Sequence, residues 1–188
     1  MKVKYRNKNR LQRLIFLIGL PATGKSTLTK YLNQRNRYEV VCVDKFIRDL
    51  STKHNITVTE TLEKFKDQIR EEISRQASVV RVLNASVIVD MSNLISDERI
   101  RLMKEINKSY RGPNCDKIAI FFNAPLEGIL ERNRMRYLSN QDHSEISLRS
   151  MFNSIEGPKE KEFDYIMVVN DHEMVDYQKD YLHTLQNT

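Results

Sequence analysis

Residues 13–32 read RLIFLIGLPATGKSTLTKYL, an apolar run followed by a loop of small residues and then by a helix-like stretch. Within this stretch, residues 19–26 match the pattern G-x-x-x-x-G-K-[ST]. The pattern predicts a strand, a phosphate-binding loop and a helix, because the N–H groups of such a loop and the positive end of the helix dipole bind phosphate. A chance glycine-containing loop is the alternative, and the flanking strand and helix patterns argue against it.

Each part of this loop has a predicted role toward a bound nucleotide. Lys25 is expected to neutralise the β- and γ-phosphates, and the Ser26 hydroxyl is expected to ligate Mg²⁺, which prefers oxygen ligands. The predicted cofactors are therefore ATP and Mg²⁺. The residues expected to bind the nucleotide are Gly19, Leu20, Pro21, Ala22, Thr23, Gly24, Lys25, Ser26 and Thr27.

The rest of the chain predicts alternating strands and helices. Five segments are rich in Ile, Val or Phe and nearly continuous in hydrophobicity, as is typical of strands covered on both faces. Strand followed by helix, repeated along the chain, predicts an α/β fold with a parallel sheet and helices on both faces. The five predicted strands are Leu14–Gly19, Tyr38–Val43, Ser86–Asp90, Lys117–Asn123 and Asp164–Asn170.

Two of the predicted helices carry clear start signals. Thr57 and Glu60 have the spacing of a capping box, and apolar side chains at helical spacing follow them. A further helix is predicted after Ser96, where two acidic residues favour a helix start. The apolar residues on one face of the first helix are Leu62, Phe65, Ile69, Ile73, Val80 and Leu83.

The composition predicts a single globular domain over residues 1–188. The chain is 40% hydrophobic and 30% charged, with only 5 Gly and 4 Pro, which argues against a disordered or collagen-like protein. Residues 1–12 form a basic arm, and the apolar run after it is too short to span a membrane. Two isolated cysteines without metal-ligand spacing fit a reducing cytoplasm. The net charge of +6 suits a polyanionic partner such as nucleic acid.

The chain lacks the signatures of other nucleotide-binding classes. It contains no Asn-Lys-x-Asp guanine signature, no Asp-x-x-Gly switch and no Leu-Ser-Gly-Gly-Gln stretch. Residues 131–136 read ERNRMR, and with the polar segment after them they predict a lid over about 132–150 that can bring arginines onto the phosphates. The alternative is a solvated basic helix end stabilised by the helix dipole. These features favour a phosphotransferase.

Two carboxylates end two of the predicted strands. Asp44 can accept the proton of an attacking hydroxyl and orient that hydroxyl toward the γ-phosphate, or it can cap a helix. Asp90 follows SVIV and can reach Mg²⁺ directly or through water, or it can serve as a turn residue. Arg48 and Asn93 are candidates either for contact with the substrate or for holding the neighbouring carboxylates in place.

Together, the stretches GLPATGKST, VDKFIRDL, VIVDMSNL, ERNRMR and LRSMFNSIEGPKEKEFDYI resemble the kinase domain of phage polynucleotide kinases and related P-loop 5′-hydroxyl kinases. The resemblance covers about residues 14–169. It implies a three-layer P-loop kinase with a five-stranded parallel sheet of order 2-3-1-4-5 and a helical lid. It also implies transfer of the γ-phosphate of ATP to nucleic-acid 5′ ends, DNA or RNA, with Asp44 as general base.

The same resemblance implies that Lys25 and Ser26 serve the phosphates and Mg²⁺, that Asp90 supports the active site, and that Arg132 and Arg136 belong to the lid. Arg48, however, lies four residues after Asp44, whereas the phage enzymes place an arginine three residues after the base. Two other functions remain open. One is a kinase of a nucleoside or another small hydroxyl compound, and the other is an ATP-binding regulatory protein without turnover.

Overall fold

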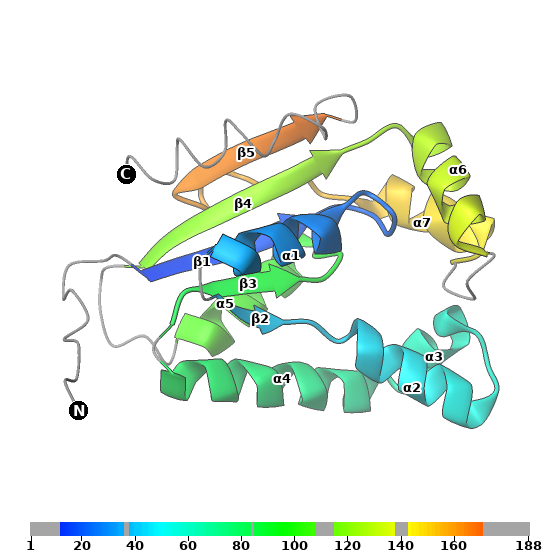
Figure 1. The fold of residues 1–188 in the computed structure, drawn as a ribbon, viewed down its shortest axis with the longest axis horizontal. Helices are drawn as coiled ribbons and strands as arrows, with labels where there is room; N and C mark the ends of the chain where they lie inside the picture. The colour runs from blue at the N-terminus through cyan, green and yellow to red at the C-terminus, as the bar shows by residue number, and fades with distance from the viewer. Residues whose placement is uncertain (1–11, 36–37, 84, 108–114, 138–142, 171–188) are drawn as a thin grey trace.

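A computed structural model describes residues 12–35, 38–83, 85–107, 115–137 and 143–170 of the chain (Figure 1). Residues 1–11 of the predicted basic arm lie outside the described residues, as do residues 138–142 within the predicted lid. None of the described helices is both long enough and apolar enough to cross a lipid bilayer.

The sheet has five parallel strands in the order β2-β3-β1-β4-β5, as predicted. Each predicted strand is present with its bounds shifted by at most a few residues. All five strands run in one direction, so their carboxyl ends share one edge of the sheet (Figure 1). The strands are β1 (Gln12–Ile18), β2 (Glu39–Val41), β3 (Val87–Asp90), β4 (Cys115–Asn123) and β5 (Tyr165–Asn170).

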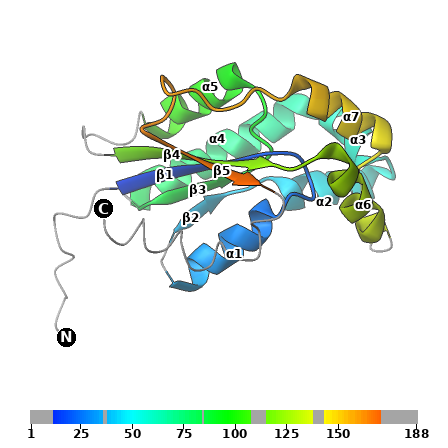
Figure 2. The ribbon, with the colours of Figure 1, turned by 90° about the horizontal axis from the view of Figure 1, so that it is seen from above.

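Helices cover both faces of this sheet, which makes three layers. Figure 2 shows α1 on one face, α4 and α5 on the other, and α6 and α7 beyond the carboxyl ends of the strands. The seven helices of the described chain are α1 (Lys25–Arg35), α2 (Asp44–His54), α3 (Val58–Lys64), α4 (Lys66–Leu83), α5 (Ser96–Asn107), α6 (Leu126–Tyr137) and α7 (Glu145–Ser154).

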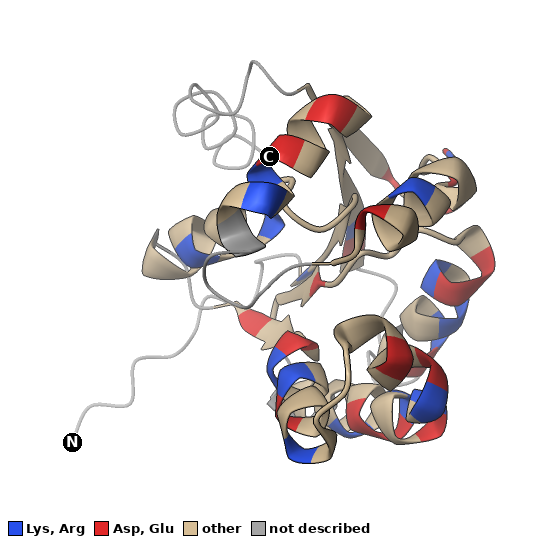
Figure 3. Cartoon of the chain, turned by 90° about the vertical axis from the view of Figure 1, so that its right-hand side faces the viewer, with Lys and Arg blue, Asp and Glu red and all other residues tan. Residues whose placement is uncertain are grey.

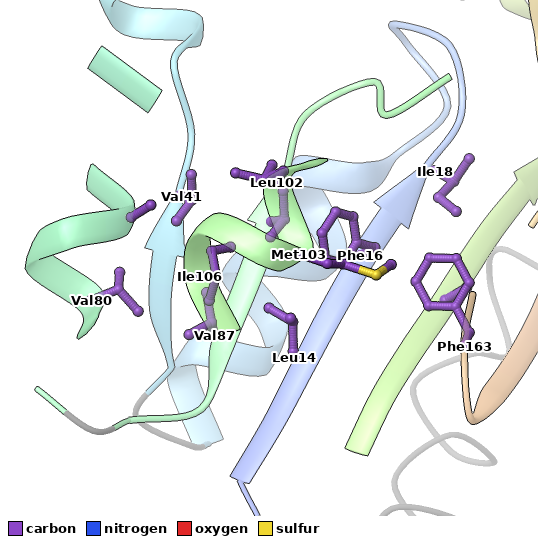
Figure 4. Close-up of a cluster of buried hydrophobic side chains, with 13 residues drawn as sticks. Leu14, Phe16, Ile18, Val41, Val80, Val87, Leu102, Met103, Ile106 and Phe163 are labelled. Atoms are coloured by element: carbon purple, nitrogen blue, oxygen red, sulfur yellow. The ribbon is translucent and has the colours of Figure 1, made fainter. Parts of the chain in front are cut away.

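The central strand β1 is buried on both faces, which explains its unbroken hydrophobicity. Leu14, Phe16 and Ile18 pack with apolar residues of α4 and α5 (Figure 4). Ile15 and Leu17 point to the opposite face and pack in the cluster that includes Leu32 of α1. These five of the seven β1 residues have no exposed surface, so the strand anchors the loop that follows it.

The helix predicted after Thr57 is two helices. The capping box is present, with the Thr57 hydroxyl accepting from the Glu60 N–H at 3.2 Å and the Glu60 carboxylate accepting from the Thr57 N–H at 2.8 Å. Helix α3 ends at Lys64, and Phe65 leaves helical geometry at φ −111° and ψ 26°. Its ring packs on His54 of α2 with centroids 4.6 Å apart. The apolar spacing continues across this break, so periodicity alone predicts one helix.

Candidate active site

The predicted site residues gather at the carboxyl edge of the sheet. Gly19 directly follows β1, Asp44 begins α2 shortly after β2, and Asp90 is the last residue of β3. Because β2, β3 and β1 are neighbours in the sheet, these three positions lie at adjacent strand ends. Ligands of open parallel sheets bind at this edge.

The loop between β1 and α1 has the backbone that its sequence predicts. Gly19 has φ +152°, and a Cβ there would lie 2.9 Å from the Cβ of Phe122, so a larger residue would have to displace β4. Gly24 also has a positive φ, at 95°. The Thr23 hydroxyl donates to the Leu20 carbonyl at 2.8 Å, which closes the loop from within.

Ala22 has φ +63°, a conformation that costs an L-residue with a Cβ on the order of 1 kcal/mol. We expect Ala22→Val to lower the free energy of unfolding by about 2 kcal/mol, because β-branched residues fit this region poorly. Ala22→Gly is the matched control and should stay within about 1 kcal/mol of the parent chain, because easier backbone geometry offsets the lost methyl group. Urea unfolding of the three proteins measures both effects. Equal stability of the two variants would contradict backbone strain at this position.

Lys25 begins α1 and is almost fully buried. Its ammonium group donates to the carbonyl of Gly19 at 2.9 Å and to that of Leu20 at 2.6 Å. The positive charge is therefore held inside the loop, at the N-terminus of a helix whose dipole also favours an anion.

Asp90 is a buried carboxylate in a polar setting. Burial raises its pKa above the ordinary value, and the negative charge of Asp44 acts in the same direction. Hydrogen bonds from Thr29 and Ser26 and the charge of Lys25 oppose that rise without cancelling it. The neighbouring protein groups therefore compensate the negative charge of Asp90 only in part. A carboxylate in this state is suited to bind a cation.

Ser26 and Asp90 fit the donor set that Mg²⁺ requires. They bring one hydroxyl and one carboxylate together, both hard oxygen donors. Among the described residues there is no group of three or more His, Cys, Asp or Glu side chains that could hold a metal ion. Sites that bind Mg²⁺ through one or two protein oxygens complete the shell with water and phosphate oxygens.

Asp44 is the first residue of α2 and does not cap it. The capping position is Val43, and no side chain caps the helix. Asp44 is exposed, and its charge acts on both Asp90 and Cys42. The alternative reading of Asp44 as an N-cap is therefore wrong, and its carboxylate faces solvent beside the site.

Arg48 and Ile47 occupy different faces of α2. Ile47 is buried in an apolar cluster with Val43 and Leu50, so it cannot contact a ligand at the surface. Arg48 is exposed and lies four residues after Asp44, a spacing that puts both side chains on one helix face. In this chain, the arginine on the face of Asp44 is therefore Arg48.

The Asn93 side chain binds main-chain carbonyls. Its amide donates to Leu17 at 2.8 Å, to Met91 at 3.1 Å and to Val89 at 3.3 Å, and its backbone has φ +50°. These bonds tie the loop after β3 to both β1 and β3. The geometry favours a positioning role for Asn93 over contact with a substrate.

One of the two predicted lid arginines reaches the loop. Arg132 of α6 donates from its Nε to the Ala22 carbonyl at 3.0 Å. The side chain of Arg136 lies outside the described part of the chain. Arg132 therefore links α6 to the phosphate-binding loop, and its role as a lid arginine toward the phosphates stays a prediction.

Sequence reasoning missed Gln76, which positions the backbone before Asp44. Its side-chain oxygen accepts from the Cys42 N–H at 2.8 Å, and its NH₂ group donates to the Cys42 carbonyl at 3.0 Å. Gln76 thereby bonds both the N–H and the carbonyl of Cys42, the residue after edge strand β2, as the backbone of a neighbouring strand would. Burial and the charge of Asp44 raise the pKa of the Cys42 thiol to about 11, so the thiol stays protonated at neutral pH. A half-buried glutamine on a helix carries no sequence signal for this role.

A model of the AAA domain family, AAA_33, matches residues 14–156. The chain belongs to this AAA domain family. The match begins in β1 and ends after α7, so it contains the phosphate-binding loop, Asp44, Asp90 and Arg132. No curated protein matches the sequence of this AAA domain significantly.

Solved structures show that this AAA domain has the P-loop kinase fold. A Chloroflexus aurantiacus protein with a provisional kinase assignment is 17% identical, with a TM-score of 0.68 over 94% of this chain and 98% of the other. Kti12 from Chaetomium thermophilum, solved with ADP-AlF3, is 16% identical, with a TM-score of 0.63 over 93% and 97%. A gluconokinase from Sinorhizobium meliloti is 15% identical, with a TM-score of 0.56 over 94% and 95%. At these identities the likeness establishes the fold.

Proposed function

We propose that this AAA domain is an ATP- and Mg²⁺-dependent kinase that transfers the γ-phosphate to a hydroxyl group. The observation that carries the proposal is the position of Asp44. It is an exposed carboxylate whose charge reaches Asp90, beside the hydroxyl of Ser26 and the ammonium of Lys25. This position supports Asp44 as the base for the acceptor, next to groups suited to phosphate and Mg²⁺.

The residues of the site divide the work of phosphoryl transfer. The loop N–H groups and Lys25 bind and orient the donor phosphates, and Asp44 accepts the proton of the attacking hydroxyl. Arg132 adds positive charge beside Ala22 in the loop, to whose carbonyl its Nε donates. Mg²⁺, when bound near Ser26 and Asp90, supplies neutralisation of the charge on the phosphates.

The acceptor that we propose is the 5′-hydroxyl of a nucleic acid. The resemblance to polynucleotide kinases and the net charge of +6 support this acceptor. Arg48 lies on the helix face of Asp44, where a guanidinium can bind the phosphate next to a terminal hydroxyl. A nucleoside has no phosphate for Arg48 to bind, so a contribution of Arg48 to acceptor binding is expected only for a nucleic acid.

A small hydroxyl compound is the second candidate. Gluconokinase shares the fold, and charges of both signs alternate over the helices at the end of the molecule that carries α2, α6 and α7 (Figure 3). A groove between α2 and α4 is lined by Glu71 and Glu72 together with Phe46, Gln68 and Arg75. Arg75 pairs with Glu72 at 2.7 Å, so Glu71 leaves the groove with one net negative charge, which offers a long polyanion no favourable contact there.

Salt dependence separates these two acceptors. For a 5′-hydroxyl oligonucleotide, we expect acceptor affinity to fall with salt, with a log–log slope of about 0.7 for each contacted phosphate of a single strand. The KM of a nucleoside should change little, because it carries no charge. Arg48→Gln should reduce the slope for the oligonucleotide, whereas Lys53→Gln, at an exposed position near the end of the same helix, should leave it unchanged. A nucleoside that is the better substrate at every salt concentration would contradict the nucleic-acid acceptor.

A further inference from the structure

A fully buried ion pair lies outside the predicted site residues. Arg99 of α5 and Glu162, in the segment before β5, both have no exposed side-chain surface. The Arg99 Nε lies 2.8 Å from one carboxylate oxygen of Glu162, and Ser96 donates to the other at 2.6 Å. Burial alone would raise the pKa of Glu162, but hydrogen bonds from Arg99 and Ser96 lower it below the ordinary value, so Glu162 is ionised at neutral pH.

Stability alone is a weak reason for such a pair. The desolvation of two charges cancels much of their attraction, and well-packed apolar residues in their place often stabilise a protein equally well. A role for the pair therefore has to come from what else its groups bind.

Arg99 joins two loops that are far apart in sequence. Its terminal N–H groups bind the loop after β3 and the segment after α7. The Glu156 N–H also donates to the Leu94 carbonyl at 2.9 Å, which reinforces this junction. The carbonyls that accept from Arg99 are those of Asn93 at 3.0 Å, Leu94 at 3.2 Å, Glu156 at 2.9 Å and Gly157 at 3.2 Å.

The loop after β3 in turn touches the phosphate-binding loop. The Ser92 carbonyl accepts from the N–H of Gly19, the first residue of that loop, at 3.0 Å. Asn93, whose carbonyl binds Arg99, donates its side-chain amide to Leu17 at the end of β1. An unbroken set of hydrogen bonds therefore runs from Glu162 through Arg99 and residues 92–93 to the start of the nucleotide site.

We propose that Arg99 and Glu162 are a positioning pair of the nucleotide site. By fixing the loop that carries Ser92 and Asn93, they hold Gly19 and the neighbouring carboxylate Asp90 in the arrangement that binds nucleotide phosphates. The pair also ties the loop after β3 to the segment after α7. The same bonds therefore set the distance between the phosphate-binding loop and the end of α7. The inference rests on the proposed function in that it takes the loop to be a nucleotide site.

A double substitution separates positioning from a merely structural role. Arg99→Met and Glu162→Leu should each lower the unfolding midpoint by roughly 10 °C, because each leaves one buried charge unpaired. The double variant should recover part of that loss, because no lone charge remains, although the carbonyls that accepted from Arg99 lose their donor. It does not restore the bonds to the four carbonyls, so we expect it to bind ADP at least about tenfold more weakly than the parent chain. Arg101→Met, at an exposed position of α5, is the matched control and should leave both quantities unchanged.

Binding of a fluorescent ADP analogue, measured well below each unfolding midpoint, is the readout. A double variant with recovered stability and parental affinity for ADP would overturn the proposal. If the double variant fails to fold, Arg99→Lys decides. Lysine can pair with Glu162, but its single ammonium cannot bridge both loops, so weaker ADP binding supports positioning and parental affinity overturns it. The ADP-binding assay contains no acceptor. If the parent chain phosphorylated no acceptor, that result would count against the proposed function, and the ADP-binding comparison would still test the positioning pair.

Discussion

Lys25→Met is expected to reduce phosphoryl transfer by at least about a hundredfold with every acceptor, while the protein stays folded. The ammonium group is the positive charge held inside the loop, bonded to the carbonyls of Gly19 and Leu20. Methionine keeps the buried apolar part of the side chain and removes only the charge and its hydrogen bonds. Turnover with labelled ATP, together with a thermal unfolding curve, measures both parts of the expectation.

The matched control for this substitution is Lys30→Met, which removes an exposed lysine from the same helix. It should leave turnover unchanged, since Lys30 lies on the surface of α1. If Lys25→Met kept more than about a tenth of the parental turnover, Lys25 would not be a charge clamp of the kind that P-loop kinases require.

Asp44→Asn is expected to lower kcat by about 10² to 10⁴ while the affinity for ATP changes little. Asparagine has nearly the same size and fits the first turn of α2, but it cannot accept a proton from the acceptor. Its effect on the donor should be small, because Asp44 is exposed and lies beside the phosphate-binding loop rather than in it. Steady-state kinetics with each substrate varied, and direct ATP binding, separate the two effects.

Asp49→Asn provides the control, since Asp49 is an exposed carboxylate on the same helix. It should leave kcat unchanged. If Asp44→Asn weakened ATP binding as much as it lowered kcat, Asp44 would serve the metal or the structure instead of the acceptor.

The fold could be predicted from the sequence because its strongest signals are local. Strand β3 and residues 14–18 of β1 are buried, so both read as continuous apolar runs, whereas edge strand β5 leaves Tyr165 and Val168 half exposed. The phosphate-binding loop has a fixed spacing with glycines where the backbone needs them, and Gly19 and Gly24 have positive φ. The sequence therefore predicts that residues 19–26 and the acids at the strand ends lie at one edge of the sheet, and the structure has them there.

What could not be predicted depends on contacts between distant segments. The break at Phe65 coincides with the packing of its ring on His54 of α2, a contact that the apolar spacing of the helix does not reveal. Gln76 and the Arg99–Glu162 pair act through main-chain carbonyls far away in sequence, and any polar residue on a helix offers the same sequence signal. Ile47 points into the core, so the position three residues after Asp44 cannot reach the surface of α2. Arg48, four residues after Asp44, lies on the exposed face that carries Asp44.

The most direct test of the central claim is transfer of label from γ-³²P-ATP in the presence of Mg²⁺. The purified chain is incubated with a 5′-hydroxyl oligonucleotide, with nucleosides, or with no acceptor, in parallel with the Lys25→Met and Asp44→Asn variants. We expect label on the oligonucleotide 5′ end, and we expect this labelling to depend on both Lys25 and Asp44. ATP binding without label on any acceptor would contradict it and would favour a nucleotide-binding protein without turnover.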